Sequence, residues 1–502
     1  MNEKGGKKMT KTIEQRVADC RAYYETGATQ SYEFRLNALK KLRKALKAHE
    51  KDAYAAYKAD YNKGMLETTA YEFAVVYAEL DEAILELKKW MGVKKNHAPL
   101  FSMPGRGERY RDPYGVVLIV SPWNFPHNLT FCPLIGAIAG GNCAVLKPSN
   151  YTPTITKVIK ETIEDAFPEN YITVVTGGRE ENAQLFDQYF NMAFFTGGTT
   201  VARLLSEKCA QHVTPVVLEL GGKSPVYVDK EVNIKECVES LTWGKFANGG
   251  QICVCPDYMV VHEDIHDEFM KELISCIKKH QVSRNGKLRS NFTSLVSDKH
   301  FQKVCGLIDE DKVVYRVQNP DPATRQVGPV VMDNVDLSCK CMQEEIFGPL
   351  MPIITVKSKE EAVELIHKEG HVYNGSDGAQ PLALYVYTSN KKTAQYMIDH
   401  VQSGGCTVNG TIFHFLGVRF NGVGFSGNSD GYHGIASYLA FTHGRSVLRY
   451  DRLTPLHRLI IFAAWQRPVT DTILQAVTSV IKIDRLWFPL LKGDCDDKNS
   501  KN

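Results

Sequence analysis

The sequence lacks the features that would place it in several special classes of protein. Its charges are nearly balanced, with 60 lysine and arginine residues against 57 aspartate and glutamate residues, so the formal net charge is only +3. Such a small excess predicts no nucleic-acid partner unless the basic groups are clustered. The N-terminal run Met1–Lys8 has no apolar core after its lysines, which argues against a secretory signal and predicts a short disordered lead. No internal repeat or low-complexity tract is present.

Regular cysteine spacing is also absent. Thirteen cysteines are scattered through the chain, which is not the arrangement of a small disulfide scaffold. This favours a reducing compartment in which thiols stay free, and it predicts a cytoplasmic location. The pairs Cys253/Cys255 and Cys339/Cys341 have no second pair or histidine partner at zinc-finger spacing, so no metal site is expected.

The chain does have strong secondary-structure patterns. From Thr12 to about Trp90, apolar residues recur at three-to-four spacing and predict amphipathic helices. Between Val116 and Leu220, short apolar runs alternate with helical segments. The expected strands are 116–120, 144–146, 172–175, 192–195 and 215–220, and the expected helices are 129–139, 156–167 and 199–211.

This alternation predicts an α/β fold, with a parallel sheet covered by helices on both faces. A Rossmann-like dinucleotide-binding domain follows from it. The alternation resumes after Cys253, with a strand expected at 258–261 and a helix at 265–279, and this predicts a second α/β domain. With 502 residues, the chain is long enough for two or three domains, each with a substantial core.

Two motifs carry chemistry when they are considered together. Cys253 follows a loop that contains Gly249 and Gly250, which let backbone pass close to a ligand because neither has a Cβ. Glu219 ends a buried-strand pattern 34 positions earlier. A single cysteine is more often a buried inert thiol, and a single strand-end carboxylate is more often ion-paired. Together, the thiol and the carboxylate describe a nucleophile and a base.

These motifs, with Pro122–Pro126 (PWNFP) and Glu344–Pro349 (EEIFGP), resemble those of the aldehyde dehydrogenase superfamily. The run Ser403–Asn409 (SGGCTVN), followed by His414 and Phe415, is most similar to its class 3 branch, which includes the fatty aldehyde dehydrogenases. The resemblance implies NAD(P)-dependent oxidation of aldehydes to carboxylic acids. Medium- or long-chain aliphatic or aromatic aldehydes are the expected substrates, and His414 and Phe415 are expected near the substrate entrance.

The resemblance also implies the catalytic roles. Cys253 would add to the aldehyde carbon, and the site must either favour its thiolate or deprotonate it in place. The side-chain amide of Asn124 and the backbone N–H of Cys253 would hold the resulting oxyanion. Glu219 would activate the water that hydrolyses the thioester, and partial burial would raise its pKa toward the working pH. His433 is interpreted as a structural hydrogen-bonding residue.

The cofactor, NAD or NADP, is expected to be held by residues from several motifs. Thr196–Gly198 resembles the pyrophosphate turn, although the family usually has glycine where this chain has Ala202. Asn150 replaces a glutamate that would repel a 2′-phosphate, so use of NADP as well as NAD is predicted. The complete expected set is Trp123, Lys147, Ser149, Asn150, Thr196, Gly197, Gly198, Leu220, Glu345 and Phe347.

The expected domains follow the same resemblance. The dinucleotide-binding domain would comprise residues 12–105 and 115–219, and the catalytic domain residues 220–403. Residues 106–114 and 404–450 would form a small β ribbon for oligomerisation, which implies a homodimer. Residues 451–502 form an apolar and amphipathic tail, in which charges such as Arg467 and Asp471 break every run before the roughly 20 residues that a membrane span needs. The tail could dock on the dimer or lie at a membrane surface.

Two other functions stay open at this point. A relative that passes the thioester to coenzyme A would share the nucleophile, but a retained water-activating base at Glu219 favours hydrolysis. A non-catalytic scaffold with the same fold would have no need of Cys253, Glu219 and Asn124 together. Product analysis with and without coenzyme A distinguishes hydrolysis from acyl transfer. An assay for NADH with a panel of aldehydes distinguishes an enzyme from a non-catalytic scaffold.

Overall fold

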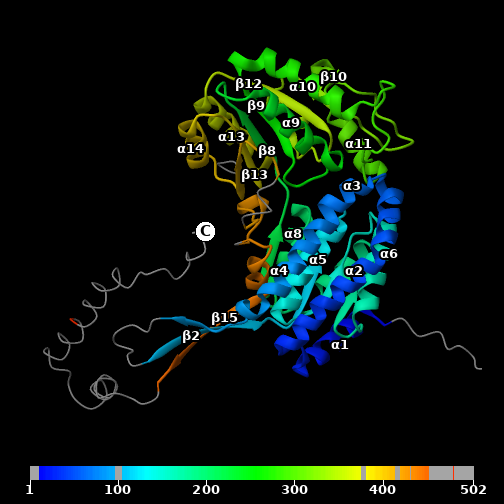
Figure 1. Cartoon of the computed structure of the whole chain (residues 1–502), viewed down its shortest axis with the longest axis vertical. Coiled ribbons are helices and arrows are strands. Elements are labelled where there is room, and N and C mark those ends of the chain that lie inside the picture. Colours follow the sequence, from blue (N-terminus) through cyan, green and yellow to red (C-terminus); the bar gives the residue numbers. More distant parts are fainter. Residues whose placement is uncertain are drawn as a thin grey trace, which may run out of the picture. The chain divides into compact units, whose positions relative to one another are not determined.

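The computed structural model describes residues 11–96, 105–374, 380–412, 419–429, 431–450 and 479 (Figure 1). The chain divides into two compact units. The first comprises Met1–Leu87 and Pro113–Thr442, and it holds both of the larger sheets. The second comprises Lys88–Asp112 and His443–Asn502.

The N-terminal helices are α1 (Ile13–Glu25), α2 (Tyr32–Tyr61), α3 (Met65–Thr68) and α4 (Ala74–Trp90), with a π-helical turn η2 (Thr69–Phe73) before α4. Thr12 and Gln15 form a capping box at the start of α1, and Asn62 ends α2 in the left-handed conformation. Apolar residues on one face of α2 are buried, among them Leu39, Leu42 and Leu46. The predicted helical region is therefore confirmed.

The five-stranded sheet is entirely parallel, in the order β5-β4-β3-β6-β7. Its strands are β3 (Val116–Val120), β4 (Cys143–Lys147), β5 (Ile172–Val174), β6 (Met192–Thr196) and β7 (Val216–Glu219). The connecting helices are α5 (Pro126–Gly140), α6 (Pro153–Ala166), α7 (Arg179–Phe186) and α8 (Thr199–Ala210). This is a doubly wound order in which the chain reverses direction between β3 and β6, the place where such folds bind ligands. The predicted dinucleotide-binding fold is confirmed.

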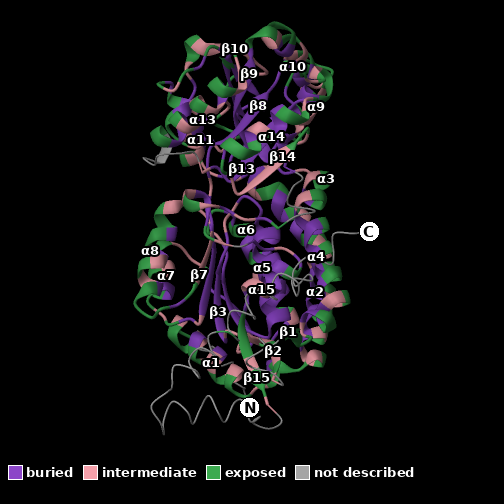
Figure 2. Ribbon diagram, turned by 90° about the vertical axis from the view of Figure 1, so that its left-hand side faces the viewer, coloured by how far each residue is buried: buried purple, intermediate pink, exposed green. Residues whose placement is uncertain are grey.

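The seven-stranded sheet has the order β10-β11-β12-β9-β8-β13-β14, and only the β10–β11 pair is antiparallel. Its strands are β8 (Ser224–Val228), β9 (Pro256–His262), β10 (Val313–Arg316), β11 (Val330–Met332), β12 (Leu350–Val356), β13 (Ala383–Tyr387) and β14 (Gly405–Val408). The accompanying helices are α9 (Ile234–Phe246), α10 (His266–Gln281), α11 (Asp298–Gly306), α12 (Lys340–Gln343), α13 (Lys359–Asn374) and α14 (Lys391–His400). Strands β8, β9 and β13 are buried along their whole length, as expected of a parallel sheet covered on both faces (Figure 2).

The second unit contains a three-stranded ribbon in the order β1-β2-β15. Its strands are β1 (Lys94–Asn96), β2 (Arg106–Pro113) and β15 (Thr442–Arg449). Arg445 pairs with Asp112 at 2.5 Å, and Arg449 pairs with Glu108 at 2.8 Å, so exposed ion pairs link β2 to β15. The segment 106–114 thus contains one strand of the ribbon, β2, whereas residues 405–408 of the segment 404–450 form β14 in the seven-stranded sheet.

Sequence periodicity missed some elements. The short helices α7 and α15 (Ile435–Ala440) are too brief to show a clear period. The predicted helical face Ile473 to Ile481 and the residues His414 and Phe415 lie outside the described residues, apart from Ser479. Among the described residues, no helix is both long enough and apolar enough to span a bilayer.

Candidate active site

The expected site residues lie at matching edges of the two large sheets. In the five-stranded sheet they stand at the carboxyl ends of parallel strands: Trp123 and Asn124 follow β3, Lys147 ends β4, Thr196 ends β6 and Glu219 ends β7. In the seven-stranded sheet they stand at the amino ends: Cys253 precedes β9 and Glu345 precedes β12. Hydrogen bonds and close contacts join the two groups, as the following paragraphs describe.

The loop before Cys253 has an unusual backbone. Asn248, Gly249 and Gly250 are all left-handed, with φ angles of 52°, 63° and 74°. A Cβ on Gly250 would collide with the carbonyl oxygen of Gly348, so glycine is required where these two backbones approach each other. At Gly250, the close approach is therefore to the backbone of another protein segment.

Three polar side chains hold this loop against the segment that follows β3. Asn124 is buried, and its Nδ2 donates to the carbonyl of Gln251 at 3.2 Å. Asn248 Nδ2 donates to the carbonyls of Asn124 and Gln251 at 3.0 and 3.1 Å. Glu67 accepts from the backbone N–H of Asn248 and from the hydroxyl of Thr293. The Asn124 amide is thus directed toward the loop that carries Cys253.

The Cys253 thiol is partly buried, and the backbone N–H groups of Cys253 and Val254 point toward its sulfur. Burial, with a smaller contribution from the Glu345 and Glu219 carboxylates, raises the pKa of this thiol to about 12. The ligand-free site therefore does not favour the thiolate. The sequence left two possibilities open, a site that favours the thiolate and a thiol that is deprotonated in place. These charges and this burial are compatible with the second.

Glu219 is buried at the end of β7, where its Oε1 accepts a 2.5 Å hydrogen bond from Ser429. Its Oε2 has no partner among the described residues. Burial raises the pKa of this carboxyl to about 8, although the Ser429 hydrogen bond lowers it. Glu219 is therefore buried, and its pKa lies above the ordinary value, in the direction expected from the sequence.

Strand β7 itself is positioned by a segment whose role the sequence did not indicate. Asn428 Oδ1 accepts from the N–H of Leu218 at 2.8 Å, and Ser426 accepts from the N–H of Leu220 at 3.0 Å through its carbonyl. Ser429 and Asn428 come more than two hundred residues after Glu219, so no local pattern could connect them. In the sequence, the tight turn before Asn428 and Ser429 was indicated only by glycines such as Gly424 and Gly427.

Glu345 and Phe347 face the same region. A Cβ on Gly221 would collide with the Glu345 carboxylate, and the N–H of Gly222 donates to that carboxylate. Burial, together with the nearby Asp257, raises the pKa of Glu345 to about 8. Phe347 is left-handed, with φ 51°, and its ring meets that of Trp123 edge-on at 5.3 Å.

His300 fixes this aromatic pair and was not expected from the sequence. Burial lowers the pKa of His300 to about 4, so the ring is neutral, and its Nε2 donates to the Phe347 carbonyl at 2.8 Å. Its ring also lies 5.3 Å from that of Trp123. No motif distinguishes this histidine from the others in the chain.

A buried ion pair holds the Glu345 segment in place. Lys223 pairs with Asp257, and both side chains are almost fully buried. Lys223 Nζ also donates to the carbonyls of Cys341 and Glu344, and Asp257 accepts from the N–H of Ile346 at 3.0 Å. This pair connects the amino ends of β8 and β9 to the loop before β12.

Lys147 is buried at the end of β4, where its Nζ donates to the carbonyls of Pro148 and Gly177 at 3.0 and 2.8 Å. Burial lowers the pKa of this lysine to about 8. Ser149 accepts from the N–H of Tyr151 at 3.2 Å. Asn150 is exposed beside Gly178, so its side chain can reach a bound molecule.

The turn Thr196–Gly198 joins β6 to α8. Thr196 Oγ1 is buried and has no partner among the described residues, and the space where a Gly198 Cβ would stand is open. Helix α8 begins directly after this turn, so its first N–H groups face the opening. Ala202 is buried inside a regular α8, so its methyl group does not displace the helix.

Comparison with known proteins identifies this arrangement. Residues 5–447 match the profile of the Aldehyde dehydrogenase family, which covers every site residue described above. The chain belongs to the aldehyde dehydrogenase family. The enzyme therefore carries out NAD(P)-dependent oxidation of aldehydes to carboxylic acids, as expected from the sequence motifs.

Its relatives are of the class 3 type. The chain is 37% identical over 439 residues to 4,4'-diaponeurosporen-aldehyde dehydrogenase of Staphylococcus aureus, covering 87% of this chain and 93% of that one. It is 35% identical over 438 residues to aldehyde dehydrogenase family 3 member A2 of Rattus norvegicus, covering 87% and 88%. It is 36% identical over 440 residues to the dimeric NADP-preferring aldehyde dehydrogenase of Canis lupus familiaris, covering 87% and 94%.

A solved structure of the family has the same fold. The substrate-bound state of Staphylococcus aureus AldH superposes with a TM-score of 0.87 at 34% identity, covering 94% of this chain and 100% of that one. The predicted combination of a Rossmann-like domain, a second α/β domain and a β ribbon is therefore confirmed.

The aldehyde dehydrogenase has an apolar pocket beside Cys253. Most of the lining residues are aromatic or aliphatic, and Asn128 and His433 are the polar side chains among them. The apolar lining consists of Tyr71, Phe125, Leu129, Ile252, Val254, Ile412, Phe420 and Tyr432. Such a lining suits the hydrocarbon part of an aldehyde.

The features at the strand ends fit the dinucleotide that this family uses. An open helix start with an unpartnered Thr196 hydroxyl suits a pyrophosphate, and the buried Lys147 offers donors for ribose hydroxyls. Glu345 offers a carboxylate that can accept from a second ribose, close to the aromatic rings of Trp123 and Phe347.

Proposed function

We propose that Cys253 is the nucleophile of this aldehyde dehydrogenase, Glu219 its general base and Asn124 its oxyanion-binding residue. The observation that carries this proposal is the environment of Glu219. Its carboxylate is buried and has one oxygen without a partner, at the same sheet edge as Asn124 and opposite the loop of Cys253. An unpartnered buried carboxylate is costly, so a role for that oxygen is expected.

In the first step, the Cys253 sulfur forms a bond to the aldehyde carbon, and the thiol proton passes to a carboxylate or to water. The carbonyl π electrons become a negative charge on the oxygen, which accepts hydrogen bonds from the Asn124 amide and the backbone N–H of Cys253. The dinucleotide of this family, when bound, would accept the hydride from this carbon, which would leave a thioester on Cys253.

In the second step, Glu219 takes a proton from a water molecule as the water oxygen attacks the thioester carbon. The carbon–sulfur bond breaks, the acid is released and the sulfur recovers a proton. Only the ionised form of Glu219 can accept that proton. With a pKa of about 8, this form becomes abundant only at mildly alkaline pH.

The dinucleotide is proposed to contact Trp123, Lys147, Ser149, Asn150, Thr196, Gly197, Gly198, Leu220, Glu345 and Phe347. Asn150 carries no negative charge, which supports use of NADP as well as NAD. The domain boundaries expected from the sequence remain part of this proposal, with residues 12–105 and 115–219 binding the dinucleotide and residues 220–403 carrying Cys253.

We infer medium- or long-chain aliphatic or aromatic aldehydes as the substrates, because the pocket beside Cys253 is almost wholly apolar. A homodimer is supported by the exposed strands of the ribbon β1-β2-β15, whose outer edges can pair with a second copy. Sedimentation velocity of the full chain tests this assembly.

A cytoplasmic location is proposed on the basis of the free cysteines, and the tail 451–502 is proposed either to dock on the dimer or to contact a membrane surface. Liposome sedimentation of the full chain, compared with a chain that ends near Asp451, distinguishes the two. If the full chain and the shortened chain sediment with liposomes to the same extent, the tail does not bind the membrane and docking on the dimer remains.

The chemical proposal is tested by product analysis and single-turnover kinetics. Without coenzyme A, the enzyme should release carboxylic acid and NADH in equal amounts. If turnover requires coenzyme A, the enzyme transfers the acyl group to coenzyme A and does not hydrolyse the thioester. Cys253→Ala should abolish turnover, and the matched variant of another partly buried cysteine, Cys305→Ala, should not. Glu219→Gln should retain a first-turnover burst of NADH but lose steady turnover. Steady turnover equal to that of the wild type would rule out the role of Glu219.

A further inference from the structure

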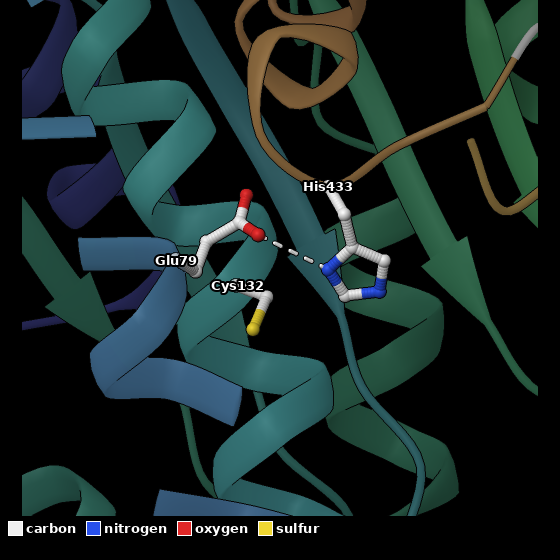
Figure 3. A group of neighbouring side chains, drawn as sticks. All are labelled: Glu79, Cys132 and His433. Atoms are coloured by element: carbon white, nitrogen blue, oxygen red, sulfur yellow. Dashed lines mark hydrogen bonds and ion pairs between the residues drawn. The ribbon is translucent and has the colours of Figure 1, made fainter. Parts of the chain in front are cut away.

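Three side chains with metal-binding atoms meet beside the substrate pocket, outside the residues assigned to catalysis. They are Glu79 on α4, Cys132 on α5 and His433 in the turn before α15, and Figure 3 shows them converging from these three segments. One ligand atom from each lies within 4.8 Å of the other two. Among the described residues, no other group of three such side chains is this close.

We propose that Glu79, Cys132 and His433 form a binding site for a divalent transition-metal ion of the zinc class, and that occupancy of this site inhibits aldehyde oxidation. This proposal departs from the sequence expectation, which considered only cysteine pairs and found no metal site. The three ligands come from segments about 50 and 300 residues apart, so no spacing motif could reveal them.

The donor set suits this class of ion. A thiolate, an imidazole nitrogen and a carboxylate oxygen are the ligands that zinc prefers, and hard cations such as magnesium avoid sulfur. In a tetrahedral zinc site, with bonds of about 2.0–2.3 Å, neighbouring ligand atoms stand about 3.5 Å apart. Glu79 Oε2 and His433 Nδ1 already stand 3.2 Å apart, and the three ligand atoms lie within 4.8 Å of one another, so each separation would have to shorten by about 1.3 Å at most.

The ligands are already held by neighbouring groups. Glu79 Oε1 accepts from the backbone N–H of Gly434 at 2.7 Å, which leaves Oε2 directed at His433. The Cys132 thiol donates to Asn128 Oδ1 at 3.3 Å. Glu79 and Cys132 are both buried, so the surrounding groups restrict the positions that the two side chains can take.

The position of His433 connects this site to the reaction. His433 lines the pocket that contains Cys253, as does Asn128, the partner of Cys132. An ion can therefore enter through the pocket, and three protein ligands leave a fourth position for water. A hydrated cation in the wall of an apolar pocket would take space and remove the apolar surface that the aldehyde requires.

Cobalt provides the test, because a thiolate bound to Co²⁺ gives a charge-transfer band in the near ultraviolet, and tetrahedral Co²⁺ gives intense visible bands. The full chain is titrated with CoCl₂ under a non-thiol reductant, and Zn²⁺ is then added to displace the cobalt. The variants are Cys132→Ser, Glu79→Gln and Cys253→Ser, with Cys276→Ser as a control for an unrelated buried cysteine. Folding of each is checked by circular dichroism.

The wild type, Cys253→Ser and Cys276→Ser should each bind one equivalent of Co²⁺ and show the charge-transfer band. Cys132→Ser should lose the band, and Glu79→Gln should weaken Co²⁺ binding by about tenfold or more. Absence of the band from the wild type, or its loss in Cys253→Ser with retention in Cys132→Ser, would overturn the site. These readouts need no turnover, so they are independent of the catalytic proposal.

The inhibitory role is measured separately. Zn²⁺ should lower the aldehyde kcat/KM of the wild type by about tenfold or more at saturation, and Cys132→Ser should be resistant while keeping its metal-free activity. Equal inhibition of both proteins would show that zinc acts elsewhere, for example on Cys253, and would refute the inhibitory role.

Discussion

The hydroxyl of Ser429 donates a 2.5 Å hydrogen bond to Oε1 of Glu219 and leaves Oε2 without a partner among the described residues. The two residues are 210 positions apart in the chain. One oxygen of the proposed base is therefore anchored, and the other is available to a water molecule. This arrangement orients the carboxylate without neutralising it.

Removing this anchor should change the pH dependence of turnover. The Ser429 hydrogen bond lowers the pKa of Glu219, which burial raises to about 8. In Ser429→Ala, the ionised carboxylate loses a donor, so the rising limb of the kcat–pH profile should shift upward by about one unit or more. Ser403→Ala, which removes a serine hydroxyl that donates to the backbone carbonyl of Gly405, should leave the profile unchanged. If the rising limb of the profile does not shift in Ser429→Ala, that limb does not report the ionisation of Glu219.

Burial of Glu219 should also make stability depend on pH. Its pKa is about 8 in the folded chain against 4.5 for an unperturbed glutamate, so between these values the folded state binds more protons than the unfolded state. Stability from the protonated carboxyl is complete below pH 4.5 and is lost as the pH rises through about 8. Glu219→Gln should therefore gain stability relative to the wild type as the pH rises from 5 to 9, by up to about 4 kcal/mol. Denaturant unfolding measures this difference, and the exposed Glu180→Gln should show no such trend.

Asn150 should control the choice between the two nucleotides. Asn150→Glu places a negative charge where a 2′-phosphate is expected, so kcat/KM with NADP should fall by about tenfold or more while that with NAD is retained. Asn150→Gln is the matched neutral control. A wild-type preference for NAD of several hundredfold would contradict the expected use of both nucleotides.

Loss of the Asn124 amide should slow the chemical step. Asn124→Ala removes one proposed oxyanion donor and should lower kcat/KM for aldehydes by about 10² to 10³. Alkylation of Cys253 by iodoacetamide should continue at a similar rate, because the thiol does not need that donor. If alkylation is lost together with turnover, the substitution has disturbed the Cys253 loop, and the kinetic loss cannot be assigned to the oxyanion.

The buried pair Lys223–Asp257 should matter for both stability and cofactor binding. Lys223→Met leaves a buried carboxylate without its cation, so the free energy of unfolding should fall by about 3–5 kcal/mol. The KM for the nucleotide should rise, because Lys223 also holds the carbonyl of Glu344. Lys230→Met breaks an exposed pair with Asp264 and should change stability by less than about 1 kcal/mol. If the free energy of unfolding falls by a similar amount in Lys223→Met and Lys230→Met, burial does not make the Lys223–Asp257 pair more important than an exposed pair.

Much of the fold could be predicted from local patterns. Strand β3 is a continuous apolar run of five residues, and β4 and β6 each begin with four apolar residues. Such runs signal a sheet covered on both faces, and the limits of these strands were predicted to within about one residue. The candidate nucleophile, base and oxyanion donor could be named because each lies in a short motif. The short helices α7 and α15 were missed because a period of 3.6 residues cannot be recognised in so few residues.

The sequence by itself determined the family, the order of the elements and the residues offered for catalysis, because these depend on local composition and spacing. Only the tertiary structure decided which distant groups support them, such as Ser429 beside Glu219, His300 beside Phe347, and Cys132 beside Glu79 and His433. It also decided that burial raises the pKa of Cys253, which the sequence had left open, and that Glu219 is fully buried. A pKa depends on the solvent and charges that folding removes or brings near, and neither is a property of neighbouring positions along the chain.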